Sequence, residues 1–175
     1  MELRTERLHL RKYRETDIPA MVALLGAPEV AATTLRIPHP YTEKDARDYL
    51  SRQATNASSN WFGLFVAETG ELCGGVGLSV EEQHRRAELG YWIGVPYWGR
   101  GYATEAAREM LRYGFENLNL NRIFAGVFSG NQTSMGVLKK IGMTYEGTSR
   151  QHFLKWGKFL DDVQYAILSS EWKAR

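Results

Sequence analysis

The sequence has a single cysteine, Cys73, among its 175 residues, and this excludes a disulfide bond within the chain. A lone cysteine in an apolar, β-patterned run is most often a buried thiol, so we expect Cys73 to be buried and inert. No apolar stretch approaches the roughly 18 residues that a membrane-spanning helix needs, and the first residues lack the apolar core of a signal peptide. These absences predict a cytoplasmic protein without a membrane partner.

An excess of charge of one sign is also absent. The 22 Lys and Arg residues nearly balance the 20 Asp and Glu residues, and no basic run marks a face that follows a nucleic-acid backbone. The four histidines lack the spacing of metal ligands. We therefore expect neither a nucleic-acid partner nor a metal. The length and the hydrophobic fraction of 43% suit one globular domain over residues 1–175.

The order of patterned segments predicts a mixed α+β domain in three layers, α/β/α. The predicted strands are 8–11, 61–68, 71–80, 86–95 and 122–128, followed by a hairpin of 143–155 and 159–168. The predicted helices follow a cap at Thr16-Asp17, open at 42–45, and cover 104–115 and 133–141, the last ended by Gly142. Residues 30–41 are expected to be irregular because Pro38 and Pro40 interrupt them, and 57–60 reads as a polar link.

The most informative feature is a glycine-rich turn between a predicted strand and a predicted helix. It reads Gly94-Val95-Pro96-Tyr97-Trp98-Gly99-Arg100-Gly101-Tyr102-Ala103-Thr104-Glu105. Glycine permits left-handed backbone angles and close approach of a ligand to the backbone. The N–H groups at a helix N-terminus, together with the positive end of the helix dipole, favour an anion. The turn therefore predicts a site for a phosphorylated cofactor.

Two common phosphate loops do not fit this turn. A P-loop needs lysine where Arg100 stands and a hydroxyl where Gly101 stands. A dinucleotide fingerprint needs glycine or alanine at Thr104 and an acidic residue after the next strand, which ends in 129–131, Ser-Gly-Asn. The turn is therefore neither of these loops.

The turn and its neighbours resemble the GNAT superfamily of acyl-coenzyme A-dependent N-acyltransferases, in particular its RimJ/RimL-like branch of ribosomal-protein N-terminal acetyltransferases. Gly101-Tyr102-Ala103 matches the second half of the family's pyrophosphate loop, Q/R-x-x-G-x-G/A, although Trp98 replaces the expected Gln or Arg. The other matching segments are 87–93, 131–134 and 140–143, and the resemblance extends from Leu3 to about Trp172. It implies the GNAT fold, with a mostly antiparallel mixed sheet of about seven strands, splayed in the middle, and about four helices.

The resemblance implies acetyl-CoA as the cofactor. Backbone amides of the glycine turn are expected to hold its pyrophosphate. Amides near the end of the preceding strand are expected to polarise the thioester carbonyl. Asn131 is expected to contact the pantetheine arm, and it also fits a helix cap. The expected cofactor-binding residues are Ile93, Val95, Gly99, Arg100, Gly101, Tyr102, Ala103, Thr104 and Asn131.

Glu88 and Ser134 are the candidate catalytic residues. Glu88 shares a strand face with Gly90 and Trp92, where a carboxylate could act as a base through a water molecule. The alternative is a carboxylate paired with Arg86 or with another surface cation. The resemblance makes Ser134 the general acid for the leaving thiolate, and a helix serine without a role is the alternative. Because no cysteine or Ser-His pair suggests an acyl-enzyme, we expect direct attack in a ternary complex.

The expected acceptor is a primary amine. The resemblance favours a protein N-terminus, while a small amine such as a polyamine, an amino acid or an antibiotic is an alternative. Residues 35–41 and the hairpin tip at 153–156 are expected to form the acceptor pocket. A non-catalytic sensor of acyl-CoA belongs to a different class and is also open, as are the monomeric and homodimeric states.

Overall fold

The computed structural model describes residues 1–55 and 60–172, so the predicted polar link falls largely outside the described residues. The chain forms two compact units. The first comprises Met1–Gly77 and Tyr91–Ala106, and the second comprises Leu78–Gly90 and the chain from Ala107 onward.

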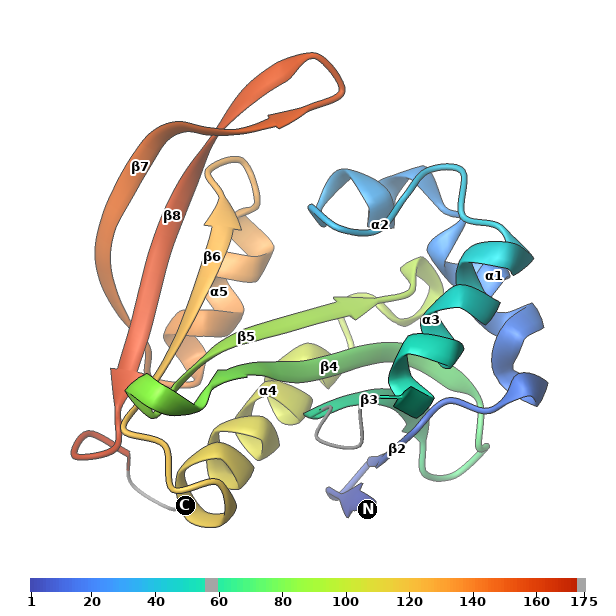
Figure 1. The fold of residues 1–175 in the computed structure, drawn as a ribbon, viewed down its shortest axis with the longest axis horizontal. Coiled ribbons are helices and arrows are strands. Elements are labelled where there is room, and N and C mark those ends of the chain that lie inside the picture. The colour runs from blue at the N-terminus through green and yellow to red at the C-terminus, as the bar shows by residue number, and fades with distance from the viewer. Residues whose placement is uncertain (56–59, 173–175) are drawn as a thin grey trace. The chain divides into compact units, whose positions relative to one another are not determined.

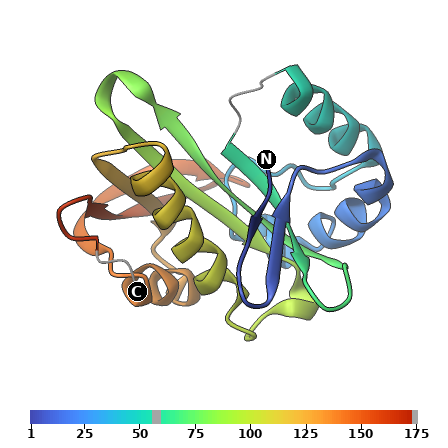
Figure 2. The same cartoon turned by 90° about the horizontal axis from the view of Figure 1, so that it is seen from below.

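The first unit contains the N-terminal strands and three helices. Its strands are β1 (Leu3–Arg4), β2 (Leu8–Arg11), β3 (Asn60–Val66) and the first part of β4 (Leu72–Glu81), and its helices are α1 (Ile18–Leu25), α2 (Pro28–Ala32) and α3 (Glu43–Thr55). Strands β1 and β2 form a short antiparallel hairpin beside the N-terminus (Figure 2), and β2 continues antiparallel to β3.

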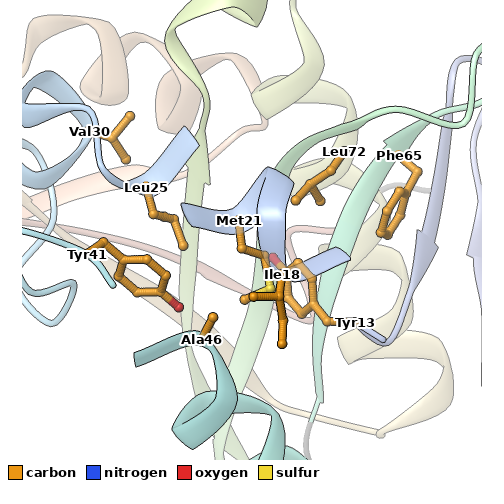
Figure 3. Close-up of a cluster of buried hydrophobic side chains, with 9 residues drawn as sticks. All are labelled: Tyr13, Ile18, Met21, Leu25, Val30, Tyr41, Ala46, Phe65 and Leu72. Atoms are coloured by element: carbon orange, nitrogen blue, oxygen red, sulfur yellow. The ribbon is translucent and has the colours of Figure 1, made fainter. Parts of the chain in front are cut away.

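One hydrophobic cluster holds the first unit together (Figure 3). Its buried members come from α1, α2, α3, strands β3 and β4, and the segments after β2 and before α3: Tyr13, Ile18, Met21, Leu25, Val30, Tyr41, Ala46, Phe65 and Leu72. Burial of such side chains stabilises a fold by about 1.5–3 kcal/mol each before conformational entropy is subtracted. The cluster is therefore the core that fixes α1 and α3.

Two predictions for this unit were wrong in part. Residues 30–41 are not all irregular, because α2 begins at Pro28, where a proline needs no helical N–H partner, and buries Val30. Asp17 occupies the N-cap position of α1, as predicted, but its side chain makes no capping hydrogen bond there. Its carboxylate instead accepts hydrogen bonds from the Arg11 guanidinium at 2.7 Å and from the Arg14 N–H at 2.8 Å.

The second unit is built on a long C-terminal hairpin. Its elements are the first part of β5 (Arg86–Ile93), β6 (Arg122–Phe128), α5 (Gln132–Lys140), β7 (Thr144–Lys155) and β8 (Lys158–Leu168). Figure 1 shows β6, β8 and β7 side by side with α5 next to β6. Trp156 and Gly157, with φ of 49° and 74°, make the two-residue turn of the predicted hairpin. Helix α5 is followed by Gly142 with φ of 94°, as its sequence predicts.

The strands form one mixed sheet with the order β1-β2-β3-β4-β5-β6-β8-β7. The described residues thus contain eight strands and five α-helices, where about seven and about four were expected. In the second unit β5 runs parallel to β6, and their ladder extends from Arg86–Arg122 to Glu88–Phe124. Strand β6 continues to Phe128, paired on its other side with β8.

Helix α4 (Tyr102–Arg112) begins two residues before the predicted start and continues into a π-helical turn, Tyr113–Asn117. Its predicted small-residue stripe is buried: Ala106, Ala107, Met110 and Leu111 have no exposed surface. A Cβ atom at Gly114 would lie 2.6 Å from the Ile123 Cδ1 atom. Small residues therefore let this helical segment lie close to β6, as the sequence predicts.

We predict that Gly74→Ala lowers the free energy of unfolding by about 1–3 kcal/mol, the usual cost of overpacking. A Cβ atom there would lie 2.4 Å from the carbonyl oxygen of Trp92, and backbone cannot move aside as a side-chain end can. Urea unfolding followed by tryptophan fluorescence measures the effect.

Gly136→Ala is the matched control, because a Cβ atom at this α5 position meets no described heavy atom within 4 Å. Alanine favours helix by about 0.8–1.0 kcal/mol over glycine, so this variant should be slightly more stable. Equal unfolding midpoints for Gly74→Ala and wild type would contradict the close packing of β4 against β5.

Candidate active site

The glycine turn has the backbone geometry of an anion site. After β5 a 3₁₀ turn, Val95–Tyr97, leads to Gly99 and Gly101, whose φ angles are 75° and 81°. Helix α4 follows at once, and the N–H of Glu105 donates to the carbonyl oxygen of Gly101 at 3.1 Å. The N–H groups that precede this bond point out of the helix end, because the first turn of a helix offers them no partner.

The turn also has room for a ligand. A Cβ atom at Gly99 would meet no described heavy atom within 4 Å, and one at Gly101 would meet only the Arg7 guanidinium, at 3.4 Å. Exposed N–H groups around an open, left-handed turn fit the pyrophosphate of a nucleotide cofactor. The residues present therefore fit acetyl-CoA, and the contact of each expected cofactor-binding residue with it stays a prediction.

Trp98, which replaces the expected Gln or Arg, fastens the turn to the preceding strand. Its indole Nε1–H donates to the carbonyl oxygen of Ile93 at 2.7 Å, while 47% of the residue stays exposed. Val95, between them, is also exposed. The guanidinium of Arg100 lies 5.5 Å from the centre of the Tyr97 ring, at the outer edge of the turn. The departure at Trp98 thus leaves the backbone of the turn intact.

Glu105, in the first turn of α4, is bound by residues about 100 positions earlier in the chain. Its carboxylate accepts hydrogen bonds from the Thr5 hydroxyl at 2.6 Å and from the Arg7 backbone N–H at 2.8 Å, and it pairs with the Arg7 guanidinium at 2.6 Å. Burial alone would raise the pKa of Glu105, but these hydrogen bonds and the charge of Arg7 outweigh it and lower the pKa. The sequence offers no local signal for a contact at this separation.

Glu88 lies in the second unit at the last pair of the β5–β6 ladder, opposite Phe124, and is half-buried. The Arg86 guanidinium, which the sequence offered as its partner, forms an ion pair with Glu81 at 2.8 Å. The role of Glu88 as a base stays a prediction.

Asn131 and Ser134 lie in the second unit and contact each other. The Asn131 Oδ1 atom accepts a hydrogen bond from the Ser134 N–H at 3.0 Å, so the predicted helix cap of α5 is confirmed. The cap fixes Ser134 in the first helical turn, half-buried. The backbone that carries the Ser134 hydroxyl is thus fixed by the cap. The role of this hydroxyl as a general acid stays a prediction.

The two segments expected at the acceptor pocket differ in exposure. Tyr41 is buried in the core cluster of the first unit and Ile37 packs against that cluster, whereas Leu35 is exposed. The role of 35–41 at the acceptor pocket stays a prediction. Burial raises the pKa of Tyr41 to about 12. In the second unit Leu154 and Trp156 are exposed at the hairpin tip, and the Phe153 ring contacts Phe128, with 6.1 Å between ring centres.

Cys73 is buried, as predicted, with no exposed surface. Its Sγ–H donates to the carbonyl oxygen of Leu64 at 3.3 Å, and burial raises its pKa to about 12. Such a thiol is not a nucleophile at neutral pH. The described residues contain no group of three or more potential metal ligands and no helix long and apolar enough to cross a membrane.

Sequence reasoning missed Asp162 on β8, whose carboxylate is almost fully buried. It is in register with Phe128 of β6, and Phe124 of β6 is in register with Glu88, so Asp162 and Glu88 occupy the same face of the sheet. Gln164 donates to one carboxylate oxygen, whereas Oδ1 has no hydrogen-bond partner among the described residues. Burial raises the pKa of Asp162 despite the nearby Gln164 and His152.

Comparison with known proteins identifies the family. Residues 7–144 match the family described as the acetyltransferase (GNAT) domain. The chain belongs to the GNAT acetyltransferase family. It is therefore an acetyl-CoA-dependent N-acetyltransferase, and the GNAT fold expected from the sequence is confirmed.

Two curated relatives support this membership. The uncharacterised N-acetyltransferase p20 of Bacillus licheniformis is 34% identical over 175 residues, which cover 97% of each chain. YdaF of Bacillus subtilis, named as a candidate ribosomal N-acetyltransferase, is 38% identical over 105 residues, which cover 59% of this chain and 57% of YdaF. The second relative is consistent with the predicted RimJ/RimL-like branch.

Solved GNAT structures share the fold. An acetyltransferase from Bacillus anthracis has a TM-score of 0.88 and 29% identity, with 98% of this chain and 100% of its own covered. RimL, a ribosomal L7/L12 N-acetyltransferase in complex with coenzyme A, has a TM-score of 0.87 and 18% identity, and the match covers 96% of this chain and 98% of RimL. Spermidine N-acetyltransferase from Vibrio cholerae, in complex with CoA and spermine, has a TM-score of 0.83 and 23% identity, and the match covers 95% of this chain and 98% of that protein. At such identities the last two show the fold alone.

We predict that Asp162→Asn raises the free energy of unfolding at pH 7, by about 1 kcal/mol, because it removes a buried charge with an unpartnered oxygen. A carboxyl group whose pKa is higher in the folded protein binds more protons there, so stability falls as pH rises above the unfolded pKa of about 3.9. The advantage of Asp162→Asn should therefore shrink as pH falls from 7 to about 4.

Urea unfolding at several pH values measures this effect. The control is Asp48→Asn, an exposed carboxylate paired with Lys44 on α3, which should change stability by no more than about 0.5 kcal/mol. A less stable Asp162→Asn variant at pH 7 would show that the carboxylate contributes to the fold instead of weakening it.

Proposed function

We propose that this N-acetyltransferase modifies a protein N-terminal α-amine in the cytoplasm, by direct attack of the amine in a ternary complex with acetyl-CoA. The observation that carries the cofactor part is the open turn at Gly99 and Gly101 directly before α4. The likeness to YdaF over part of the chain supports the acceptor part.

The chain's own residues divide the work of holding the cofactor. Acetyl-CoA, when bound, supplies the acetyl thioester. The N–H groups from Gly99 to Thr104 and the α4 dipole would bind its pyrophosphate, and Arg100 would add positive charge at the edge. Amides near Ile93 and Val95 would polarise the thioester carbonyl, and the Asn131 side chain would contact the pantetheine arm.

Proton transfer falls to two side chains of the second unit. Glu88 would take a proton from the acceptor through a water molecule, and the Ser134 hydroxyl would donate one to the leaving thiolate. An α-amine has an ordinary pKa of about 8, so a modest base suffices, whereas a lysine amine near 10.4 needs more help. This difference favours an α-amine as acceptor.

A covalent acyl-enzyme on the single cysteine does not fit the structure, because the Cys73 thiol is buried and its pKa is raised to about 12. The burial of this thiol supports direct attack of the amine on the thioester. Membership of an acetyltransferase family also argues against the alternative of a non-catalytic sensor.

A small amine is the second candidate acceptor. The spermidine N-acetyltransferase with the same fold was solved with CoA and spermine, so the fold accommodates a polyamine in that protein. The two acceptors are distinguished by thiol release from acetyl-CoA, measured separately with N-terminal peptides and with small amines. Turnover with peptides alone supports the proposal, and turnover with small amines alone overturns it.

With the preferred acceptor, Glu88→Gln and Ser134→Ala should each lower kcat by about 10²-fold or more, because positioned acids and bases contribute that much. Calorimetric titration should find acetyl-CoA affinity intact in both variants. Glu68→Gln and Ser51→Ala, at exposed positions, are the matched controls. Unchanged turnover in either test variant would remove that residue from the mechanism.

Gly101→Asp should abolish acetyl-CoA binding in calorimetry, because it places bulk and negative charge at the phosphate site. Gly70→Asp is a close control: Gly70 also has a positive φ, 73°, and open space around its Cβ position, but it lies in the β3–β4 turn. The two variants should lose similar stability, and only Gly101→Asp should lose binding. Normal affinity in Gly101→Asp would refute the phosphate loop.

A further inference from the structure

In the first unit the Arg7 guanidinium lies beside three consecutive residues of the glycine turn, Arg100, Gly101 and Tyr102. Its Nη1 atom donates to the carbonyl oxygen of Arg100 at 2.9 Å. Its Nη2 atom lies 3.4 Å from the Cβ position of Gly101, and its guanidinium lies 5.2 Å from the centre of the Tyr102 ring. The same group pairs with Glu105. One side chain from the β1–β2 hairpin thus connects to the turn and to the first helical turn of α4.

Glu105 poses an electrostatic problem for an anion site. A carboxylate in the first turn of a helix is favourable for the helix dipole, but it competes with a pyrophosphate for the same positive end. The side chain is only 16% exposed, so water screens it weakly, and its lowered pKa keeps it ionised at neutral pH. Arg7 supplies the positive charge that offsets it.

The turn itself also needs restraint. Gly99 and Gly101 have no side chains to hold their left-handed conformations, and glycine loses more conformational freedom than other residues on ordering. A turn that is already ordered binds its ligand without that entropic cost. The hydrogen bond from Arg7 to the carbonyl oxygen between the two glycines provides this restraint.

We propose that Arg7 is a positioning residue for the pyrophosphate of acetyl-CoA, which it serves by bracing the glycine turn and by neutralising Glu105. This inference rests on the proposed cofactor site. Arg7 does not itself carry out chemistry; it acts through the backbone of the turn and through the charge of Glu105. Thr5, whose hydroxyl donates to the same carboxylate, completes the brace.

The test is Arg7→Met, which keeps a long apolar side chain and removes the guanidinium. Calorimetry should show the dissociation constant of CoA rising by about tenfold or more, since the turn is released and Glu105 is left unpaired. The affinity for pantetheine, which lacks the pyrophosphate, should not change. It is measured by letting pantetheine displace bound CoA in the calorimeter. A merely structural role would weaken both ligands together.

Arg47→Met is the matched control, because Arg47 is also a half-exposed arginine in carboxylate ion pairs, with Glu15 and Glu43, but lies on α3 away from the turn's contacts. It should leave CoA affinity at the wild-type value. In the double variant Arg7→Met/Glu105→Gln, removal of the carboxylate charge should recover part of the lost affinity, and the missing brace should keep it below wild type.

The outcomes separate the inference from the function on which it rests. Wild-type affinity for CoA in Arg7→Met, or an equal loss for CoA and pantetheine, overturns the positioning role while leaving the cofactor site in place. Failure of the wild-type protein to bind CoA overturns the proposed site itself. Selective loss of CoA affinity in Arg7→Met, with partial recovery in the double variant, supports both elements of the proposal.

Discussion

The unpaired N–H groups at the start of α4 are the constraint on which the candidate cofactor site depends. The chain enters the helix through two glycines with positive φ, and among the described residues only the Arg7 guanidinium lies within 4 Å of a Cβ position at either glycine. An open backbone of this kind is intrinsically loose. The structure restrains it from outside, through the Trp98 indole on the carbonyl of Ile93 and through Arg7 on the carbonyl of Arg100.

Both units keep carboxylates where burial opposes ionisation. In the first unit Glu105 is fully compensated by Thr5 and Arg7, and its pKa falls. In the second unit Asp162 is compensated on one side only, and its pKa rises. Buried charges weaken a fold unless hydrogen bonds and opposite charges satisfy them, so such positions are often retained for function. The face of the sheet that carries Asp162 also carries Glu88, the proposed base.

Local patterns predicted much of the fold. Strand β6 has its predicted bounds, 122–128, because its apolar residues alternate between turn-forming neighbours, and the small-residue stripe of α4 is buried as expected. The exceptions have physical reasons. Pro28 starts a short helix that the later prolines hid. The Asp17 carboxylate binds the Arg11 guanidinium and the Arg14 backbone N–H, so it makes no capping hydrogen bond to α1.

The sequence by itself determined the family, the glycine turn and the Asn131 cap, because each depends on residue types at short, fixed spacing. Only the tertiary structure brought Arg7 to Glu105 and set Asp162 on the face of Glu88, because these relations depend on strand register and on contacts between distant segments. It also placed Tyr41 in the core of the first unit, since burial is decided by what packs against a side chain. Short-range pattern thus specified the glycine turn, and long-range packing decided which charged side chains lie beside it.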